Sequence, residues 1–470
     1  MMLWQQNFLK VLRSIIYNLI FLTYLFSLVV HIPNISQFLS VVILFALLLS
    51  VIGIGRFYQM VVGLSLVFSF TLLILYNLLS WKIIYHFSSL TNIIVLLAYA
   101  GIFCIPVHLG MYPRNLYLLF KSRVSSFKSL YATFSITTYI LCSLMSTSGI
   151  PTVRSTLYLF LRKVPEHFRK EFQTLTFVRS FVLMLFWAPV AVVPTIAIAK
   201  TNANALVVLP ILFVLSILCL IIDIQTANWR LRKKLETGAD EGVACREEKR
   251  SNTSRKTKIS LVIFLFTLSL FVATILSISN LTGYSILDSV VLMIIPYSFL
   301  WAVAMKRGKR YLQALFHRFT QDVPRLSPQV ALFISVGFMI NVISMTGLSN
   351  GINTLVSNLQ DLIGPFVLLL ISILVVALTW LGILPQLVVV FVTQTLNIRE
   401  IGLNPEWFAL AIVGAALCGS SSSPFAVNAN IVGITIDETP INVVKKNVMF
   451  AITLLLITSL LAIILEYFYN

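Results

Sequence analysis

Long apolar segments separated by short polar ones dominate this chain of 470 residues. Runs of about 20 apolar residues recur from one end to the other, and each is long enough to cross a bilayer as a helix. Hydrophobic residues make up 59% of the chain and charged residues 11%, a composition outside the range of soluble domains. We therefore expect an all-α polytopic membrane protein with about 11 transmembrane helices and no separate soluble domain.

The polar segments between the apolar runs divide the chain into two halves. Residues 1–32 are expected to form a first, retained transmembrane helix, because no small-residue cleavage site follows its apolar run. Residues 33–227 form the first half and residues 259–470 the second. Between them, residues 228–258 carry ten Lys and Arg and read as a flexible cytoplasmic linker. Uninterrupted spans are expected at residues 14–31, 38–54, 58–79, 91–109, 205–224, 259–280, 286–305, 329–347 and 447–468.

The basic residues indicate the orientation. If the apolar runs cross the membrane alternately, 30 of the 34 Lys and Arg fall on one side, which the positive-inside rule makes cytoplasmic. We therefore expect a cytoplasmic-membrane protein of the bacterial type with its N-terminus inside and its C-terminus outside. The net charge of +18 then orients the chain in the membrane and contacts anionic lipid head groups. Nucleic acid is not an expected partner.

One apolar run, Ala411 to Gly433, is interrupted in its middle by Cys418 to Pro424, which includes four consecutive serines. Proline removes a backbone donor there, and unsatisfied backbone groups facing lipid cost several kcal/mol each. A broken helix at about residues 407–434 whose break faces protein or a water-filled cavity is the favoured interpretation. A kinked helix packed against a neighbour through small residues is the alternative.

Three further segments carry similar interruptions. Residues 133–161 are too short for two full spans, and the polar cluster Ser146 to Thr152 predicts a re-entrant hairpin entering from the cytoplasm. Residues 177–199 contain two prolines and read as a second broken helix. Residues 363–398 are broken between Thr379 and Pro385 and predict a hairpin entering from outside, although their length also allows two short spans.

These elements occur in the same order in both halves. Each half has spans, a hairpin, a broken span and a last span, and the two halves cross the membrane in opposite directions. Two inverted repeats with interrupted elements at matching positions are typical of secondary transporters, which bind substrate at the interface of the repeats.

This arrangement resembles the ion transporter superfamily of divalent-anion/sodium symporters and citrate and arsenite carriers. The local match is Trp407 to Gly414 followed by Gly419 to Gly433, similar to that family's broken helix with a hydroxyl-rich break and an Asn-containing continuation. Neither hairpin tip has the Ser-Asn-Thr sequence of the dicarboxylate branch. Trp380 and Leu381 make the second tip more apolar than a small-dicarboxylate site.

The resemblance implies an elevator-type homodimer that holds substrate between hairpin tips and broken helices. Carried over by position, the substrate-binding residues would be Ser146, Thr147 and Ser148 at the first tip, Thr379 and Gly382 at the second, Pro189 at the first break, and Ser420, Ser421, Ser422 and Ser423 at the second.

Two more residues are candidates from their chemistry. Arg154 is the one basic residue inside an apolar segment, so it either binds an anionic group or extends to the cytoplasmic surface. Asn428 follows the second break and could donate to substrate, as could Asn341, for which a bond between helices is an equal alternative. Arg179 reads as a topology marker at the inner end of its helix.

The remaining chemistry is sparse. No acidic residue falls in the middle of a predicted span, which disfavours proton coupling and leaves sodium, held by carbonyl and hydroxyl oxygens, as the candidate coupling ion. The five cysteines show no spacing for a metal or a disulfide framework, and no cofactor is expected. No catalytic grouping is present, so we do not expect an enzyme.

We therefore expect a secondary active transporter of a small anionic solute. The apolar second tip also suits an amphiphilic anion. The first alternative is a translocator of an anionic lipid or polyprenyl-phosphate carrier using the same site. The second is a membrane scaffold or sensor without transport.

Overall fold

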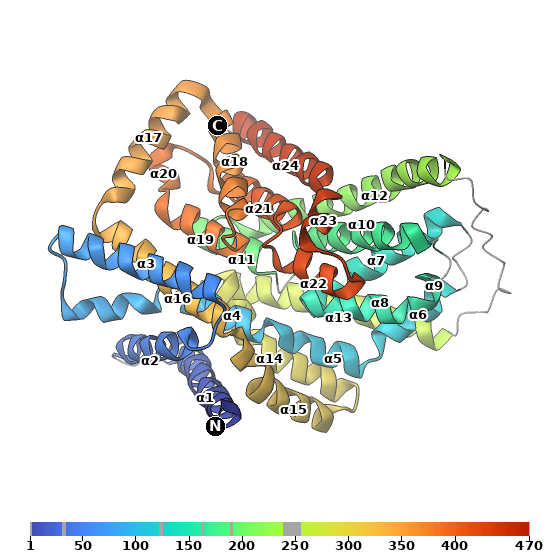
Figure 1. Cartoon of the computed structure of the whole chain (residues 1–470), viewed down its shortest axis with the longest axis horizontal. Helices are drawn as coiled ribbons and strands as arrows, with labels where there is room; N and C mark the ends of the chain where they lie inside the picture. Colours follow the sequence, from blue (N-terminus) through green and yellow to red (C-terminus); the bar gives the residue numbers. More distant parts are fainter. Residues whose placement is uncertain are drawn as a thin grey trace. The chain divides into compact units, whose positions relative to one another are not determined.

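The computed structural model describes residues 2–30, 34–121, 126–161, 164, 166–188, 191–237 and 255–469, and within these ranges it contains helices and no strand (Figure 1). Eleven helical segments in that part of the chain are long and apolar enough to cross a membrane. The prediction of an all-helical, multi-span membrane protein is therefore confirmed.

The eleven segments are not the same eleven that the sequence predicts. They include residues 127–156 and 348–380, each of which is two or more helices in succession. The predicted second span appears as helix α2 (Ile35–Val51), which is as long as predicted but shorter than any of the eleven segments, and the predicted broken span at residues 177–199 appears as separate helices α10 (Glu166–Met184) and α11 (Val192–Thr201). Interrupted elements thus account for the difference.

The described chain folds into two compact units, and each unit draws on both halves of the sequence. Unit 1 comprises residues 1–106, 278–362 and 390–402, and unit 2 comprises residues 107–277, 363–389 and 403–470. The predicted halves are therefore not the compact bodies of the fold.

Unit 1 packs long helices around α16 (Ser327–Met345), which contacts α2 and α3. Gly337 allows this helix to lie against Leu90, since a Cβ at 337 would come within 2.8 Å of the Leu90 side chain. The Asn341 amide donates to the His86 carbonyl at 2.9 Å, so its bond is structural. The unit contains α1 (Met2–Val29), α3 (Arg56–Leu75), η1 (Trp81–Ser88), α4 (Thr91–Tyr99), η2 (Ala100–Phe103), α14 (Ile286–Ala304), α15 (Gly308–His317), η4 (Arg318–Asp322), η5 (Val323–Leu326), most of α17 (Leu348–Ile363) and α20 (Ile398–Ile401).

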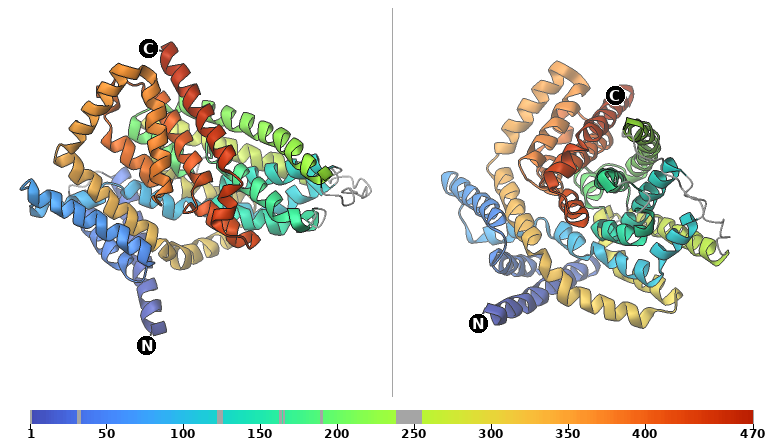
Figure 2. Two further views of the ribbon diagram at one scale, coloured as in Figure 1. Left: turned by 45° about the horizontal axis from the view of Figure 1, so that its top comes forward. Right: turned by 45° about the vertical axis from the view of Figure 1, so that its right-hand side comes forward.

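Unit 2 is built around α21 (Pro405–Ser422), which packs against α11, α18 and α24 (Figure 2). Small residues permit this close packing: a Cβ at Gly414 would lie 2.0 Å from the Thr458 hydroxyl of α24. The unit also contains α6 (Tyr112–Lys121), α7 (Phe127–Met145), η3 (Ser146–Ser148), α8 (Gly149–Thr156), α9 (Tyr158–Leu161), α10 (Glu166–Met184), α11 (Val192–Thr201), α12 (Ala205–Thr237), η6 (Gly364–Phe366), α18 (Val367–Trp380), α22 (Val427–Ile436), α23 (Pro440–Lys445) and α24 (Val448–Tyr469).

Four helices contain a boundary between the units, namely α5 (Cys104–Leu109), α13 (Arg255–Thr282), α17 at its last residue, and α19 (Pro385–Thr395). The predicted linker at residues 228–258 starts and ends as helix, because α12 continues to Thr237 and α13 begins at Arg255. Its remaining part, residues 238–254, lies outside the described residues. The segment after α16, which reads as a polar loop, is the helix α17.

Candidate functional site

The second predicted hairpin tip and the second predicted break meet inside unit 2. Helix α18 ends at Trp380 and α19 begins at Pro385, and Gly382 between them has a φ of 94° that suits glycine. Helix α21 ends at Ser422, the backbone of Ser423 is extended, and α22 begins at Val427. Both interruptions fall where the sequence places them.

Side-chain hydrogen bonds join this tip to this break. The Trp380 indole N–H donates to the Ser422 hydroxyl at 2.9 Å, and the Ser423 hydroxyl donates to the Thr379 carbonyl at 2.9 Å. Gly419 makes the approach possible, because a Cβ there would lie 2.1 Å from the Thr379 hydroxyl. The tip therefore closes directly onto the hydroxyl-rich end of α21.

The four serines are buried and use most of their hydrogen-bonding capacity within the break. Ser421 and Ser422 each donate to the Cys418 carbonyl at 2.8 Å, and Ser420 donates to the Asn428 side-chain oxygen at 3.4 Å. The Asn430 amide donates to the Pro424 carbonyl at 3.3 Å, which satisfies a backbone group freed by the interruption. The break is thus stabilised by its own side chains.

Asn428 differs from these residues because its amide nitrogen makes no hydrogen bond within the described part of the chain. Asn428 is 2% exposed, and its Nδ2 has no hydrogen-bond partner among the described residues. Gln173 of α10, a helix that packs against α22, is buried with an unpartnered Nε2 in the same part of the chain. Since buried polar groups are nearly always paired in proteins, these two donors indicate a place for an acceptor from outside the chain.

The first predicted hairpin is also present in unit 2. Helix α7 runs to Met145, η3 turns the chain, and α8 packs back against α7 (Figure 1). Gly149 allows this approach, since a Cβ there would lie 2.5 Å from the Cys142 sulfur. Ser146 adopts a φ of 48°, a conformation that is uncommon outside glycine.

The hydroxyl residues of this first tip are less buried than Thr379, the hydroxyl residue of the second tip. Ser146 and Thr147 are half-buried and Ser148 is exposed, whereas Thr379 is buried. Both η3 and α8 pack against α22, the helix that carries Asn428. The structure therefore places the first tip beside the continuation of the second broken helix, and no hydrogen bond joins the first tip to the four serines among the described residues.

Arg154 lies on α8, half-buried, and no hydrogen bond or ion pair to its guanidinium occurs in the described part of the chain. An uncompensated charge in this position is available to an anion or to the membrane surface. Both interpretations from the sequence stay open.

The first break separates α10 from α11, between Leu185 and Ala191. Pro189 lies outside the described residues, so its predicted place at the break has no structural account. The Ser216 hydroxyl donates to the Leu183 carbonyl at 2.7 Å and pairs with the Tyr139 hydroxyl at 2.7 Å. These bonds satisfy a carbonyl next to the break and tie it to α7 and α12.

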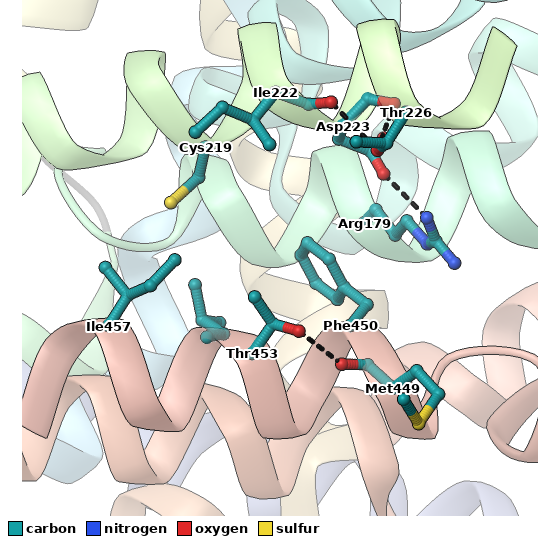
Figure 3. Close-up of a pocket in the computed structure, with 10 residues that line it drawn as sticks. Arg179, Cys219, Ile222, Asp223, Thr226, Met449, Phe450, Thr453 and Ile457 are labelled. Atoms are coloured by element: carbon teal, nitrogen blue, oxygen red, sulfur yellow. Dashed lines mark hydrogen bonds and ion pairs between the residues drawn. The ribbon is translucent and has the colours of Figure 1, made fainter. Parts of the chain in front are cut away.

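Sequence reasoning missed a buried charged pair on the first broken helix. Arg179 reads from the sequence as a topology marker, but it is 5% exposed and forms an ion pair with Asp223 of α12 at 2.7 Å (Figure 3). Tyr131 donates to the same carboxylate at 2.9 Å, and Arg179 also donates to the Asn447 side chain at 3.1 Å. The topology-marker interpretation is wrong because this side chain is paired inside the protein.

The pair lies at the wall of a cavity of about 110 Å³ between α10, α12 and α24, where the Phe450 ring faces the Arg179 guanidinium at 5.2 Å (Figure 3). An arginine at the start of the predicted segment 177–199 and an aspartate at the end of the predicted span 205–224 were the signals that could have identified the pair. Because both charges and their hydrogen bonds are satisfied within the protein, the pair fixes the helices rather than offering an open binding group.

Within the described residues there is no group of three or more His, Cys, Asp or Glu side chains placed to hold a metal ion. Around α22, the buried amides of Asn428 and Gln173 remain open, and the Arg154 guanidinium of the neighbouring α8 has no hydrogen bond or ion pair in that part of the chain.

Of the comparisons with known proteins, the one with solved structures gives a match. No protein-family model matches the chain, and no curated protein sequence matches it. Among solved structures, the YdaH transporter of Alcanivorax borkumensis, described as having an unusual topology, matches with a TM-score of 0.59 at 14% identity, covering 87% of this chain and 98% of that one. At this identity the likeness shows the fold, and membership of the ion transporter superfamily stays a prediction. The chain has the fold of a known membrane transporter structure.

Proposed function

We propose that this protein is a membrane transporter that binds a small anionic solute inside unit 2. The observation that carries the proposal is the closed contact of Thr379 and Trp380 with the serines of the second break, directly beside the unpartnered amide of Asn428. A tip resting on a broken helix next to open donors is an arrangement for holding and releasing a ligand. The fold likeness to a transporter structure supports the same class.

The preference for an anion rests on which groups remain open. Asn428 and Gln173 present amide donors, and Arg154 on the neighbouring α8 carries a positive charge. The N-terminus of α22 follows the second break, and free backbone N–H groups at a helix start also favour negative charge. A carboxylate or phosphate would satisfy these donors.

Sodium coupling and an elevator mechanism are part of the same proposal. Hydroxyl and carbonyl oxygens around the second break are suitable ligands for sodium, which we propose as the coupling ion. Movement of unit 2 as an elevator, in a homodimer, is the mechanism that the predicted inverted repeats imply.

A second candidate function has its own support. Trp380, Leu381 and Phe425 are 51%, 73% and 51% exposed, so large apolar side chains surround the junction of tip and break. Such a surface suits a ligand with a hydrocarbon part, as in an amphiphilic solute or an anionic lipid carried between leaflets.

The first test is thermal stabilisation of the purified protein by a panel of soluble anions, with and without sodium. A ligand at 100 times its dissociation constant should add about 2.7 kcal/mol. We expect Asn428→Ala to remove the stabilisation and the matched Asn341→Ala in unit 1 to keep it, with both variants folded before ligand is added. Arg154→Ala decides between anion binding, where the response is lost, and a surface position, where it is unchanged.

The outcomes separate the candidates. A sodium-dependent response that survives Asn428→Ala would move the ligand away from this site. Silence from every soluble anion together with stabilisation by an anionic lipid would favour the lipid translocator. Silence from both would contradict the proposal.

A further inference from the structure

A concave apolar groove of about 510 Å³ lies within unit 2, between α7, α12 and the part of α13 that belongs to this unit. Its wall includes Tyr139 and Ile140 of the first hairpin arm and Trp187 of the first break. Its volume falls in the range of ligand-binding pockets. The groove therefore touches two of the interrupted elements of the site without containing any of the candidate substrate-binding residues.

Water is a poor occupant for this groove, because its wall is mostly apolar, two of its polar side chains are already paired, and the Trp187 indole N–H is a single donor without a partner among the described residues. The Tyr139 hydroxyl pairs with Ser216 at 2.7 Å, and the Ser143 hydroxyl donates to the Ile140 carbonyl at 2.8 Å. A buried water needs two to four polar partners, which these groups no longer offer. The Trp187 ring contributes an apolar face, packed edge-on against Phe213 at 5.0 Å between centroids.

The groove opens to the outside of the protein through apolar side chains. Phe213 and Leu265 line it and are 40% and 48% exposed. Beside them, α12 and α13 expose Leu218 (51%) and Phe266 (65%) on helices that are long and apolar enough to span a membrane. The solvent at that surface is hydrocarbon, and an empty apolar cavity of this size would be costly.

We propose that the groove binds one hydrocarbon chain of a bilayer lipid. The chain would replace missing packing contacts between α7, α12 and α13, with its methylenes against the Trp187 indole and the Tyr139 ring. Because the Tyr139 hydroxyl also holds Ser216, which bonds to the Leu183 carbonyl, the lipid chain supports the first hairpin arm and the first break together. This inference stands independently of the transported solute.

The test uses the full-length protein reconstituted in phosphatidylcholine whose acyl chains carry bromine, a contact quencher of tryptophan fluorescence. The contribution of Trp187 is the difference between the wild type and Trp187→Phe. We expect this contribution to be quenched by brominated chains. Ala273→Phe, at a groove-lining position of α13, should remove the quenching, whereas Val262→Phe, on the lipid-facing surface of the same helix outside the groove, should keep it.

A second measurement tests retention of the lipid. Native mass spectrometry of the detergent-purified protein should show a bound phospholipid that is lost in Ala273→Phe and kept in Val262→Phe. Trp187 emission quenched by aqueous iodide in place of brominated lipid would show a water-filled groove and overturn the proposal. Absence of quenching together with disulfide cross-linking between two copies of Ala273→Cys would show that a second copy of the chain covers the groove, and would overturn it too.

Discussion

The two broken helices of unit 2 are interrupted at similar places and sealed in different ways. At the first break, the Leu183 carbonyl accepts from the Ser216 hydroxyl, which in turn pairs with the Tyr139 hydroxyl, and the same helix is fixed by the Arg179–Asp223 pair. At the second break, serines and Asn430 satisfy the backbone, and the Asn428 amide is left without a partner in the described chain. A mid-helix interruption therefore does not by itself make a binding site. What distinguishes the second break is that its open amide lies next to Ser420 of a break onto which a hairpin tip closes.

The largest expected effect on stability comes from the buried ion pair of the first broken helix. Asp223→Ala leaves the Arg179 charge buried and unpaired, which should lower the free energy of unfolding by about 3–5 kcal/mol. Replacing both partners, as Arg179→Met with Asp223→Leu, should restore most of this stability because no charge is left buried. Unfolding of the purified protein in detergent measures both. A loss below about 1 kcal/mol in Asp223→Ala would mean that the pair behaves like an exposed one.

The second effect concerns the close approach of tip and break. Gly419→Ala places a Cβ against the Thr379 side chain, and overpacking of this kind costs about 1–3 kcal/mol. Thr379→Ala in the same chain should recover part of the loss, since it removes the nearest atom. Gly63→Ala in α3 is the matched control, because no atom lies within 4 Å of a Cβ there. Equal stability of the two single variants would show that the tip does not rest on α21.

A smaller effect is expected from the hydrogen bond between Trp380 and Ser422. Trp380→Phe keeps an aromatic ring and removes the donor, and Ser422→Ala removes the acceptor. A double-mutant cycle on unfolding should give a coupling free energy of about 0.5–1.5 kcal/mol. Additive effects of the two substitutions would contradict the bond.

The smallest expected effect on stability comes from an ion pair between the two broken helices. Lys170 of α10 approaches Glu438, which follows α22, at 4.0 Å. The hydrogen bond from Asn442, followed by that from the Thr439 backbone and by the Lys170 charge, holds the pKa of Glu438 below its ordinary value of 4.5. A lowered pKa in the folded state stabilises the fold above pH 4.5, and this contribution is lost as pH falls from 4.5 through the folded value.

Melting temperatures measured across that pH range should therefore show a slight acid-dependent decrease that Glu438→Gln lacks. The effect is small because the side chain is close to solvent. Identical pH profiles for the two proteins would show that the ionised carboxylate contributes nothing to this link.

Much of the fold is predictable from the apolar pattern, since the ends of α14, α16 and α24 fall within two residues of their predicted positions. Glycine and proline also located the second tip, which lies between Trp380 and Pro385. Other features depend on contacts between distant residues. Arg179 and Asp223 are 44 residues apart, and nothing in their local sequence states that they pair. In α17, Asn and Gly residues interrupt the apolar pattern, while Ile352, Leu355 and Leu359 follow a helical spacing.

The candidate site was partly predictable for the same reasons. The serines of the second break stand out because four hydroxyls in an apolar run are rare, whereas the openness of Asn428 follows only from counting its hydrogen bonds in the fold. Gln173 was missed because a single amide near a basic stretch looks like a surface residue. Its burial comes from packing of α10 against α7, α21 and α22.

The division into two units that each use both halves of the chain has a consequence for biosynthesis. Unit 1 cannot be complete until residue 402 has been made, and unit 2, which begins at residue 107, needs residues 403–470. Helices from the first half must therefore enter the membrane and wait there, without their final partners, while the second half is translated. Chains that terminate early would lack α21 and α22, which pack against α10 in the complete unit, and the uncovered face of α10 would make such chains natural substrates for membrane quality control.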